Sequence, residues 1–330
     1  MTESHGSSAS QVRRIALDAA GVPMSALLAE APGSPRAVIV AIHGGGMSAG
    51  YFDSRARPGL SLMTLGAELG YTVLAVDRPG YGSSAEHLPD GQGVLEQADT
   101  LHAALADFAR DRDIGGGFFF LAHSNGGKLA LAAGARTGEH PLIGLDISGL
   151  GSRLAVGPHQ LPGSNGHGEW RRHWGALRLY PPDAFRLGRS LVSPVPAREA
   201  QEGPLWPELY PGFAALVQVP VRFTFAEQEQ WWHFDEEAIA ALRRPLAAPR
   251  VAVDHQPDAG HNISLGWAAR TYHLRALAFL EECLLAHDAA PPRPVRRKVV
   301  TRLAASVDAF DEGPDRQGGR AAGRAAPRLA

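Results

Sequence analysis

One serine of the chain stands in a setting that could make it a nucleophile. Ser124 is the central residue of the pentapeptide AHSNG at 122–126, which follows the apolar run 118–121 and precedes a segment of small residues. A serine on a sharp turn between a strand and a helix projects clear of the backbone. It also lies at a helix N-terminus, whose free N–H groups stabilise an anion. The pattern predicts attack by the Ser124 hydroxyl on an acyl carbon.

A glycine-rich tetrapeptide, HGGG at 43–46, could supply the second part of such chemistry. Consecutive glycines let the backbone approach a substrate and turn its N–H groups inward, where a Cβ would obstruct them. In acyl transfer, donors of this kind stabilise the oxyanion of the tetrahedral intermediate. The loop has neither the G-x-G-x-x-G pattern nor a Gly-Lys-Ser/Thr ending, so no nucleotide cofactor is expected. The histidines and acids show no metal-ligand spacing, so no metal is expected either.

Three motifs occur in the order and spacing of one known family. The AHSNG pentapeptide resembles the nucleophile elbow G-x-S-x-G of α/β hydrolases, with Ala122 in place of the first glycine. The HGGG loop resembles the family's oxyanion loop. The octapeptide DRPGYGSS at 77–84 resembles its D-x-x-G-x-G-x-S loop. The resemblance extends over about residues 12–287, and it implies an oxyanion hole made by the backbone N–H groups of Asn125 and Gly45, with Gly46 as the alternative to Gly45.

The resemblance also indicates the base and the acid that would activate the serine. A serine hydroxyl needs a general base, and the family places its histidine after the last strand, which favours His261 over His255. A carboxylate then holds the imidazole in the right tautomer. Aligning the dipeptide at 226–227 with the family's usual Gly-Glu puts Glu229 at the acid position. Glu227, its neighbour, and Asp146, at the end of an earlier strand, are the alternatives.

These residues need a scaffold, and the hydrophobic pattern predicts one. Short apolar runs that suit strands alternate with amphipathic helical segments, as in a mostly parallel sheet with helices on both faces. The predicted strands are 13–17, 24–30, 37–42, 72–76, 118–122, 142–147, 221–225 and 250–253, and the predicted helices are 60–69, 94–110, 127–135, 235–242 and 267–285. The fold class is therefore α/β, a doubly wound α/β-hydrolase sheet.

The alternation of predicted strands and helices is interrupted once within the chain and is absent at both ends. We expect a disordered lead at 1–11, a core at 12–150 and 216–287, a helical cap insertion at 151–215 and a disordered Pro/Arg/Ala-rich tail at 288–330. Aromatic side chains concentrate in the insertion and after the acid loop, which suits a bulky apolar or aromatic substrate. The tryptophans expected to bind it are Trp170, Trp174, Trp206, Trp231 and Trp232.

The amino-acid composition limits the classes of partner that the protein is expected to bind. The 330 residues carry a formal net charge of −2, so no general attraction to nucleic acid or to an anionic membrane is expected. The single cysteine, Cys283, excludes an intrachain disulfide and favours the cytoplasm. The start of the chain does not resemble a signal peptide, and no apolar run is long enough for a membrane helix. The expected partner is a small molecule.

The functional hypothesis is a serine hydrolase that acts on an ester, thioester or lactone through an acyl-enzyme on Ser124. The same fold hosts cyclases and lyases, so a non-hydrolytic enzyme of a biosynthetic pathway, with Ser124 and His261 as acid and base, is the alternative. A ligand-binding protein without catalysis is a third reading. Retention of both residues argues against it, because degenerate members of the family usually lose one of them.

Overall fold

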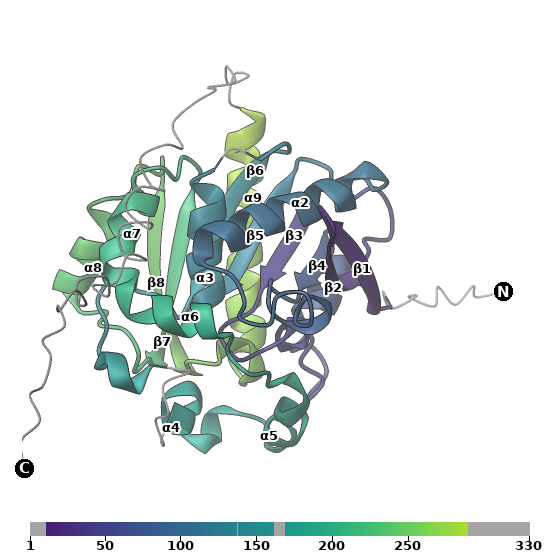
Figure 1. Ribbon diagram of the computed structural model, residues 1–330. Coiled ribbons are helices and arrows are strands. Elements are labelled where there is room, and N and C mark those ends of the chain that lie inside the picture. Colours follow the sequence, from purple (N-terminus) through teal and green to yellow (C-terminus); the bar gives the residue numbers. More distant parts are fainter. Residues whose placement is uncertain (1–10, 137, 162–168, 290–330) are drawn as a thin grey trace, which may run out of the picture. The chain divides into compact units, whose positions relative to one another are not determined.

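The computed structural model describes residues 11–136, 138–161 and 169–289. Of the predicted lead (1–11) only residue 11 is described, and of the predicted tail (288–330) only residues 288 and 289. Residues 162–168 of the predicted insertion also lie outside the described residues. In the described ranges, eight strands form one sheet in the order β1-β2-β4-β3-β5-β6-β7-β8 (Figure 1). Strand β1 (Arg13–Ala19) pairs antiparallel with β2 (Val22–Ala29), and β2 pairs antiparallel with β4. The other pairs are parallel, which confirms the predicted mostly parallel sheet.

The centre of the sheet is buried on both faces. Its strands are short and built of apolar residues, many of them β-branched or aromatic, the composition that a two-sided environment requires. These strands are β3 (Val38–Ile42), β4 (Thr72–Val76), β5 (Phe118–His123) and β6 (Leu142–Ser148). Their carboxyl ends share one edge of the sheet, so the loops that follow them converge there.

Helices cover both faces of the sheet. On one face α1 (Leu62–Glu68) and α9 (Ala269–Asp288) share an apolar core with the strands, and Cys283 of α9 is buried in it against Gly144. On the other face lie α2 (Val94–Arg110) and α3 (Asn125–Gly134) (Figure 1). This arrangement confirms the doubly wound α/β class.

The last two strands are longer than the apolar pattern predicted. Strand β7 covers Val221–Gln228 and β8 covers Val251–Gly260, against predictions of 221–225 and 250–253. Polar residues and Pro257 interrupt the apolar pattern of β8, but the backbone pairing continues across a bulge until Gln228 faces Gly260. The extension matters for the site, because the residues that follow this last pair, Glu229 and His261, emerge side by side.

Between β6 and β7 the described residues form a series of short helices, in the segment 151–215 where we predicted an insertion and which we refer to as the insertion. Its helices are α4 (Glu169–Trp174), α5 (Pro182–Gly188), α6 (Ala197–Glu202) and α7 (Trp206–Ala214). The backbone N–H of Ser193 donates to the carbonyl of Gly46 at 2.9 Å, and that of Asn262 donates to the carbonyl of His173 at 3.0 Å. The insertion therefore contacts the loops after β3 and β8. Figure 1 shows α4 and α5 beyond the ends of the strands.

The remaining helix, α8 (Glu236–Arg243), links β7 to β8. Among the described helices, none combines the length and the apolar composition that crossing a bilayer requires.

Candidate active site

Ser124 occupies a strained turn at the carboxyl end of β5. Its φ is 52° and its ψ is −122°, a backbone conformation that residues with a Cβ rarely adopt. The Ser124 N–H donates to the carbonyl of Ser148 at 2.8 Å, and the Ser124 carbonyl accepts from the N–H of Gly127 at 2.8 Å. These two hydrogen bonds hold the turn between strand and helix in place.

The packing around the turn explains its small residues. A Cβ at Gly126 would lie 2.3 Å from the backbone oxygen of Ile42, so α3 begins against the end of β3 and only glycine fits. A Cβ at Gly44 would lie 3.1 Å from the Ser124 Cβ, which brings the glycine-rich loop next to the serine. Ala122 is fully buried, so its methyl group fits where the family's pattern has a glycine.

His261 and Glu229 form a buried pair at the ends of β8 and β7. The His261 Nδ1 lies 2.8 Å from the Glu229 Oε2, and both side chains are nearly inaccessible to solvent. The other oxygen of Glu229 accepts the backbone N–H groups of Gln230 at 3.1 Å and of Trp231 at 2.9 Å. A carboxylate held in this way keeps the proton of a neutral imidazole on Nδ1, and the lone pair on Nε2 is then available as a base.

The two alternative acids are engaged elsewhere. Asp146 is fully buried and forms an ion pair with Arg222, and its Oδ1 accepts the hydroxyl of Tyr272 at 3.1 Å. The Oε2 of Glu227 accepts the backbone N–H of Asp258 at 2.7 Å. Of the three acids, Glu229 is the one that the described contacts bring to His261.

His261 lies among other aromatic rings. Its ring centroid is 4.7 Å from that of His123, 5.7 Å from that of His173 and 6.3 Å from that of Trp231. Burial, together with the neighbouring His261, lowers the pKa of His123 well below its ordinary value and that of His173 to about 3. Both neighbours are therefore neutral near pH 7. The competing histidine, His255, is exposed on β8.

The neutral side chain of His43 connects the glycine-rich loop to the backbone of Arg78. The His43 Nδ1 lies 2.8 Å from the carbonyl of Gly44, and its Nε2 accepts the backbone N–H of Arg78 at 3.1 Å. Burial and the Arg78 charge lower the pKa of His43 well below its ordinary value. The Gly46 N–H donates to the Tyr81 hydroxyl oxygen at 3.2 Å.

Two backbone N–H groups near the serine have no hydrogen-bond acceptor within the described residues. In the described part of the chain no hydrogen bond engages the N–H of Gly45 or of Asn125. The two residues adjoin, because a Cβ at Gly45 would lie 2.7 Å from the Asn125 Nδ2. Two such N–H groups beside a serine can bind an anionic oxygen, whereas Gly46, the alternative donor, is occupied by Tyr81.

The tryptophans differ in their surroundings. Trp174 packs against Tyr180 and Phe185 inside the insertion, and Trp206 packs against other aromatic rings of α7. The Trp231 ring lies next to that of His261. Trp232 and Trp206 both lie within 6.0 Å of the Lys128 Nζ. Trp170 belongs to α4, but its side chain lies outside the described residues.

Sequence reasoning missed a group of charged residues beside the serine. Glu199 of α6 forms an ion pair with Arg78 at 2.9 Å, and it accepts the side-chain amide of Asn125 at 2.7 Å and the hydroxyl of Tyr81 at 3.1 Å. Arg78 and Tyr81 belong to the loop at 77–84, which resembles the family's D-x-x-G-x-G-x-S loop. No local pattern marks Glu199, because its partners are about 74 to 121 residues away in sequence.

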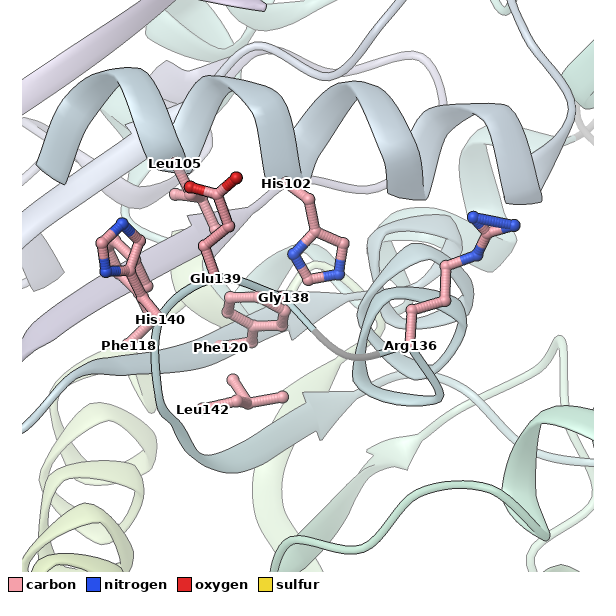
Figure 2. Close-up of a pocket in the computed structure, with 9 residues that line it drawn as sticks. All are labelled: His102, Leu105, Phe118, Phe120, Arg136, Gly138, Glu139, His140 and Leu142. Atoms are coloured by element: carbon pink, nitrogen blue, oxygen red, sulfur yellow. The ribbon is translucent and has the colours of Figure 1, made fainter. Parts of the chain in front are cut away.

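Two hollows in the surface lie apart from these groups. One is lined by residues at the amino ends of β5 and β6, such as Phe118 and Leu142, and so belongs to the opposite edge of the sheet from Ser124 (Figure 2). The other lies between α5 and the residues that follow the glycine-rich loop, with an apolar lining that includes Leu187, Leu191 and Leu265. Within the described ranges no group of three or more His, Cys, Asp or Glu side chains could hold a metal ion.

Comparison with known proteins bears on the family and the fold of the chain. The family described as the Alpha/beta hydrolase family matches residues 39–300. Comparison with curated proteins gives no match. Among solved structures, proline iminopeptidase from Mycobacterium smegmatis is similar with a TM-score of 0.62 at 18% identity, covering 83% of this chain and 99% of that one. A thermostable carboxyl esterase from Bacillus coagulans gives 0.60 at 16% identity, covering 84% and 99%.

An esterase from Thermogutta terrifontis gives a TM-score of 0.57 at 17% identity, covering 83% of this chain and 99% of that one. At these identities the solved structures support the fold, and the family match covers most of the chain. The chain belongs to the α/β hydrolase family.

Proposed function

We propose that this protein is a serine hydrolase that forms an acyl-enzyme on Ser124. The observation that carries the proposal is the arrangement of the strained Ser124 turn and the His261–Glu229 pair at the carboxyl ends of β5, β7 and β8. Both lie around the loop after β6. Ser124 is hydrogen-bonded to Ser148, and the next residue, Gly149, lies so close to the His261 ring that a Cβ there would be 2.8 Å from the Cε1.

The proposed reaction begins with attack of the Ser124 Oγ on the acyl carbon. The His261 Nε2 takes the hydroxyl proton, and Glu229 stabilises the imidazolium that forms. The N–H groups of Gly45 and Asn125 receive the negative charge that develops on the carbonyl oxygen. His261 then donates its proton to the leaving group. Water, activated by the same histidine, releases the acid and restores Ser124.

We further propose an ester or thioester with an apolar or aromatic group as the substrate. Trp231, packed beside His261, supports this class. Trp231 is the tryptophan best placed to contact such a group, whereas Trp174 and Trp206 pack among aromatic rings of the insertion.

The test is the intact mass of the protein after treatment with a fluorophosphonate probe. Wild type is expected to gain one adduct, and Ser124→Ala and His261→Ala are expected to gain none while keeping the circular dichroism spectrum of wild type. Turnover of p-nitrophenyl esters of increasing acyl size would then rank the substrates. A folded wild type that gains no adduct contradicts the acyl-enzyme and favours non-hydrolytic chemistry on the same scaffold.

A further inference from the structure

Glu199 of the insertion forms hydrogen bonds with residues that adjoin both backbone donors of the proposed oxyanion hole. The Oε1 of Glu199 accepts the side-chain amide of Asn125 at 2.7 Å and the guanidinium of Arg78 at 2.9 Å. Its Oε2 accepts the hydroxyl of Tyr81 at 3.1 Å, and the oxygen of that hydroxyl accepts the N–H of Gly46 at 3.2 Å. One carboxylate thus connects the first residue of α3 with the glycine-rich loop.

Gly45 lies next to both Asn125 and Glu199. A Cβ at Gly45 would lie 2.7 Å from the Asn125 Nδ2 and 3.0 Å from the Glu199 Oε1. The Gly45 peptide therefore packs directly on the pair formed by Asn125 and Glu199. Both backbone donors proposed for the oxyanion, at Gly45 and Asn125, are positioned by residues that contact Glu199.

The charge of Glu199 is fully engaged within the protein. Burial opposes its ionisation, but the Arg78 guanidinium, the Asn125 amide and the Lys128 charge together hold the pKa of the carboxyl below its usual range. Arg78 and Glu199 are 1% and 7% exposed in their side chains. A carboxylate that is buried, ionised and bonded to three side chains is not free to bind a cationic group of a substrate.

We propose that Glu199 is a positioning residue for catalysis, which fixes the Asn125 and Gly45 peptides at the geometry that the oxyanion requires. The proposal rests on the serine hydrolase function proposed above. Under this proposal the insertion affects catalysis by positioning the backbone donors, because helix α6 of the insertion carries Glu199. Backbone donors act strongly on a transition state only when they are aligned before the charge develops, and a displacement of about 1 Å can cost on the order of 100-fold in rate.

The test compares three substitutions of Glu199 on a p-nitrophenyl ester. Glu199→Ala removes every contact and is expected to lower kcat by about 100-fold with KM within about twofold of wild type. Glu199→Gln keeps an acceptor oxygen for Asn125 and is expected to recover most of the rate, within about 10-fold of wild type. Glu199→Asp keeps the charge but is one methylene shorter, so it is expected to resemble Glu199→Ala.

A neighbouring glutamate provides the matched control. Glu202 lies on the same helix and accepts the N–H of Val94 at 2.8 Å, away from the glycine-rich loop. Glu202→Gln is expected to leave kcat unchanged. A second variant covers the case in which Glu199→Ala fails to fold. Tyr81→Phe removes the hydroxyl that joins Gly46 to Glu199 and that also accepts from Arg78, but it keeps the contacts of Glu199 with Arg78 and Asn125. It is expected to lower kcat several-fold without changing KM.

A double-mutant cycle between Glu199→Ala and Asn125→Ala separates positioning from general structural damage. Asn125→Ala keeps the backbone donor but loses the contact with Glu199, so the two effects on kcat are expected to be strongly non-additive. Additive effects overturn the proposal, as does a kcat of wild-type size in both Glu199→Ala and Tyr81→Phe. A rise in KM alone also overturns it, because Glu199 would then contact the substrate.

Labelling by the fluorophosphonate probe separates this proposal from the one on which it rests. If wild type gains no adduct, the serine hydrolase function fails whatever the Glu199 variants do. If wild type gains the adduct and turns over the ester, a normal kcat in the variants contradicts the role of Glu199 alone.

Discussion

The backbone of Ser124 has an unfavourable conformation that the surrounding contacts must stabilise. Its φ of 52° places the Cβ in a conformation that costs about 1–3 kcal/mol, and hydrogen bonds to Ser148 and Gly127 hold it there. The strain keeps the hydroxyl at the tip of the turn. The strained conformation therefore costs stability at the position where we propose the nucleophile.

This strain predicts an unusual order of stability between two inactive variants. Ser124→Gly relieves the strain but makes the unfolded chain more flexible, so its free energy of unfolding is expected to exceed that of Ser124→Ala by about 1 kcal/mol. Urea denaturation of both variants measures the difference. Equal stabilities would show that the turn is not strained at this residue.

The pairing of Glu229 with His261 predicts which acid matters for catalysis. Glu229→Gln favours the wrong tautomer of His261 and is expected to lower kcat by about 10²- to 10⁴-fold. Glu227→Gln is the matched control, because Glu227 contacts the backbone of Asp258 and not His261. A large loss in the control and none in Glu229→Gln would exchange the two assignments.

The sequence was informative about these residues to different degrees. Ser124 could be proposed because it follows a recognisable strand in a short motif, and His261 because the family places its histidine after the last strand. The choice among Glu229, Glu227 and Asp146 depends on the register of β7 and β8, since Gln228 faces Gly260 only after a bulge. Glu199 could not be predicted, because its meaning comes entirely from contacts with distant residues.

At the scale of elements, the apolar runs located every strand of the sheet, and the ends of β7 and β8 were the main difference. Those ends are polar, because they leave the core and enter the site, so hydrophobicity could not mark them while backbone pairing continued. The short helices of the insertion contain several prolines and glycines, which erase the 3.6-residue period by which a helix is recognised.

Helix α9 carries a histidine that ties it to the rest of the core. His273 is fully buried, its Nε2 lies 3.0 Å from the Ser264 Oγ, and burial lowers its pKa to about 3. The folded pKa lies below the unfolded value of about 6.5, so the unfolded chain binds a proton that the folded chain does not. Stability contributed in this way is present above pH 6.5 and is lost as the pH falls.

His273→Gln removes this dependence. Between pH 7.5 and pH 5.0, wild type is expected to lose about 2 kcal/mol more of its free energy of unfolding than the variant does. Urea denaturation at both pH values gives the two losses. If they were the same, His273 would not be neutral at pH 5.0.

At the scale of the whole molecule, a buried ion cluster joins the second half of the sheet. Arg222 of β7 pairs with Asp146 of β6 and with Asp254 of β8, and Asp146 also accepts the hydroxyl of Tyr272 from α9. Burial raises the pKa of Asp146, although Arg222 opposes this. Removal of Arg222 leaves the buried Asp146 carboxylate without its charged partner.

Arg222→Met is accordingly expected to destabilise the protein by about 3–5 kcal/mol. The double variant Asp146→Leu with Arg222→Met is expected to recover most of that loss, because no charge is then left in the core. Urea denaturation of both proteins checks the pair. A single variant that costs less than about 1 kcal/mol would mean that water reaches Asp146.

The single cysteine has a practical consequence. Cys283 is buried under α9 against Gly144, and burial raises the pKa of its thiol to about 12. Alkylating reagents react with the thiolate, so at neutral pH the native chain is inert to them. A cysteine introduced on an exposed position of the insertion, such as Arg189, would then be the one addressable thiol, ready for a fluorophore or a spin label without removal of the native residue.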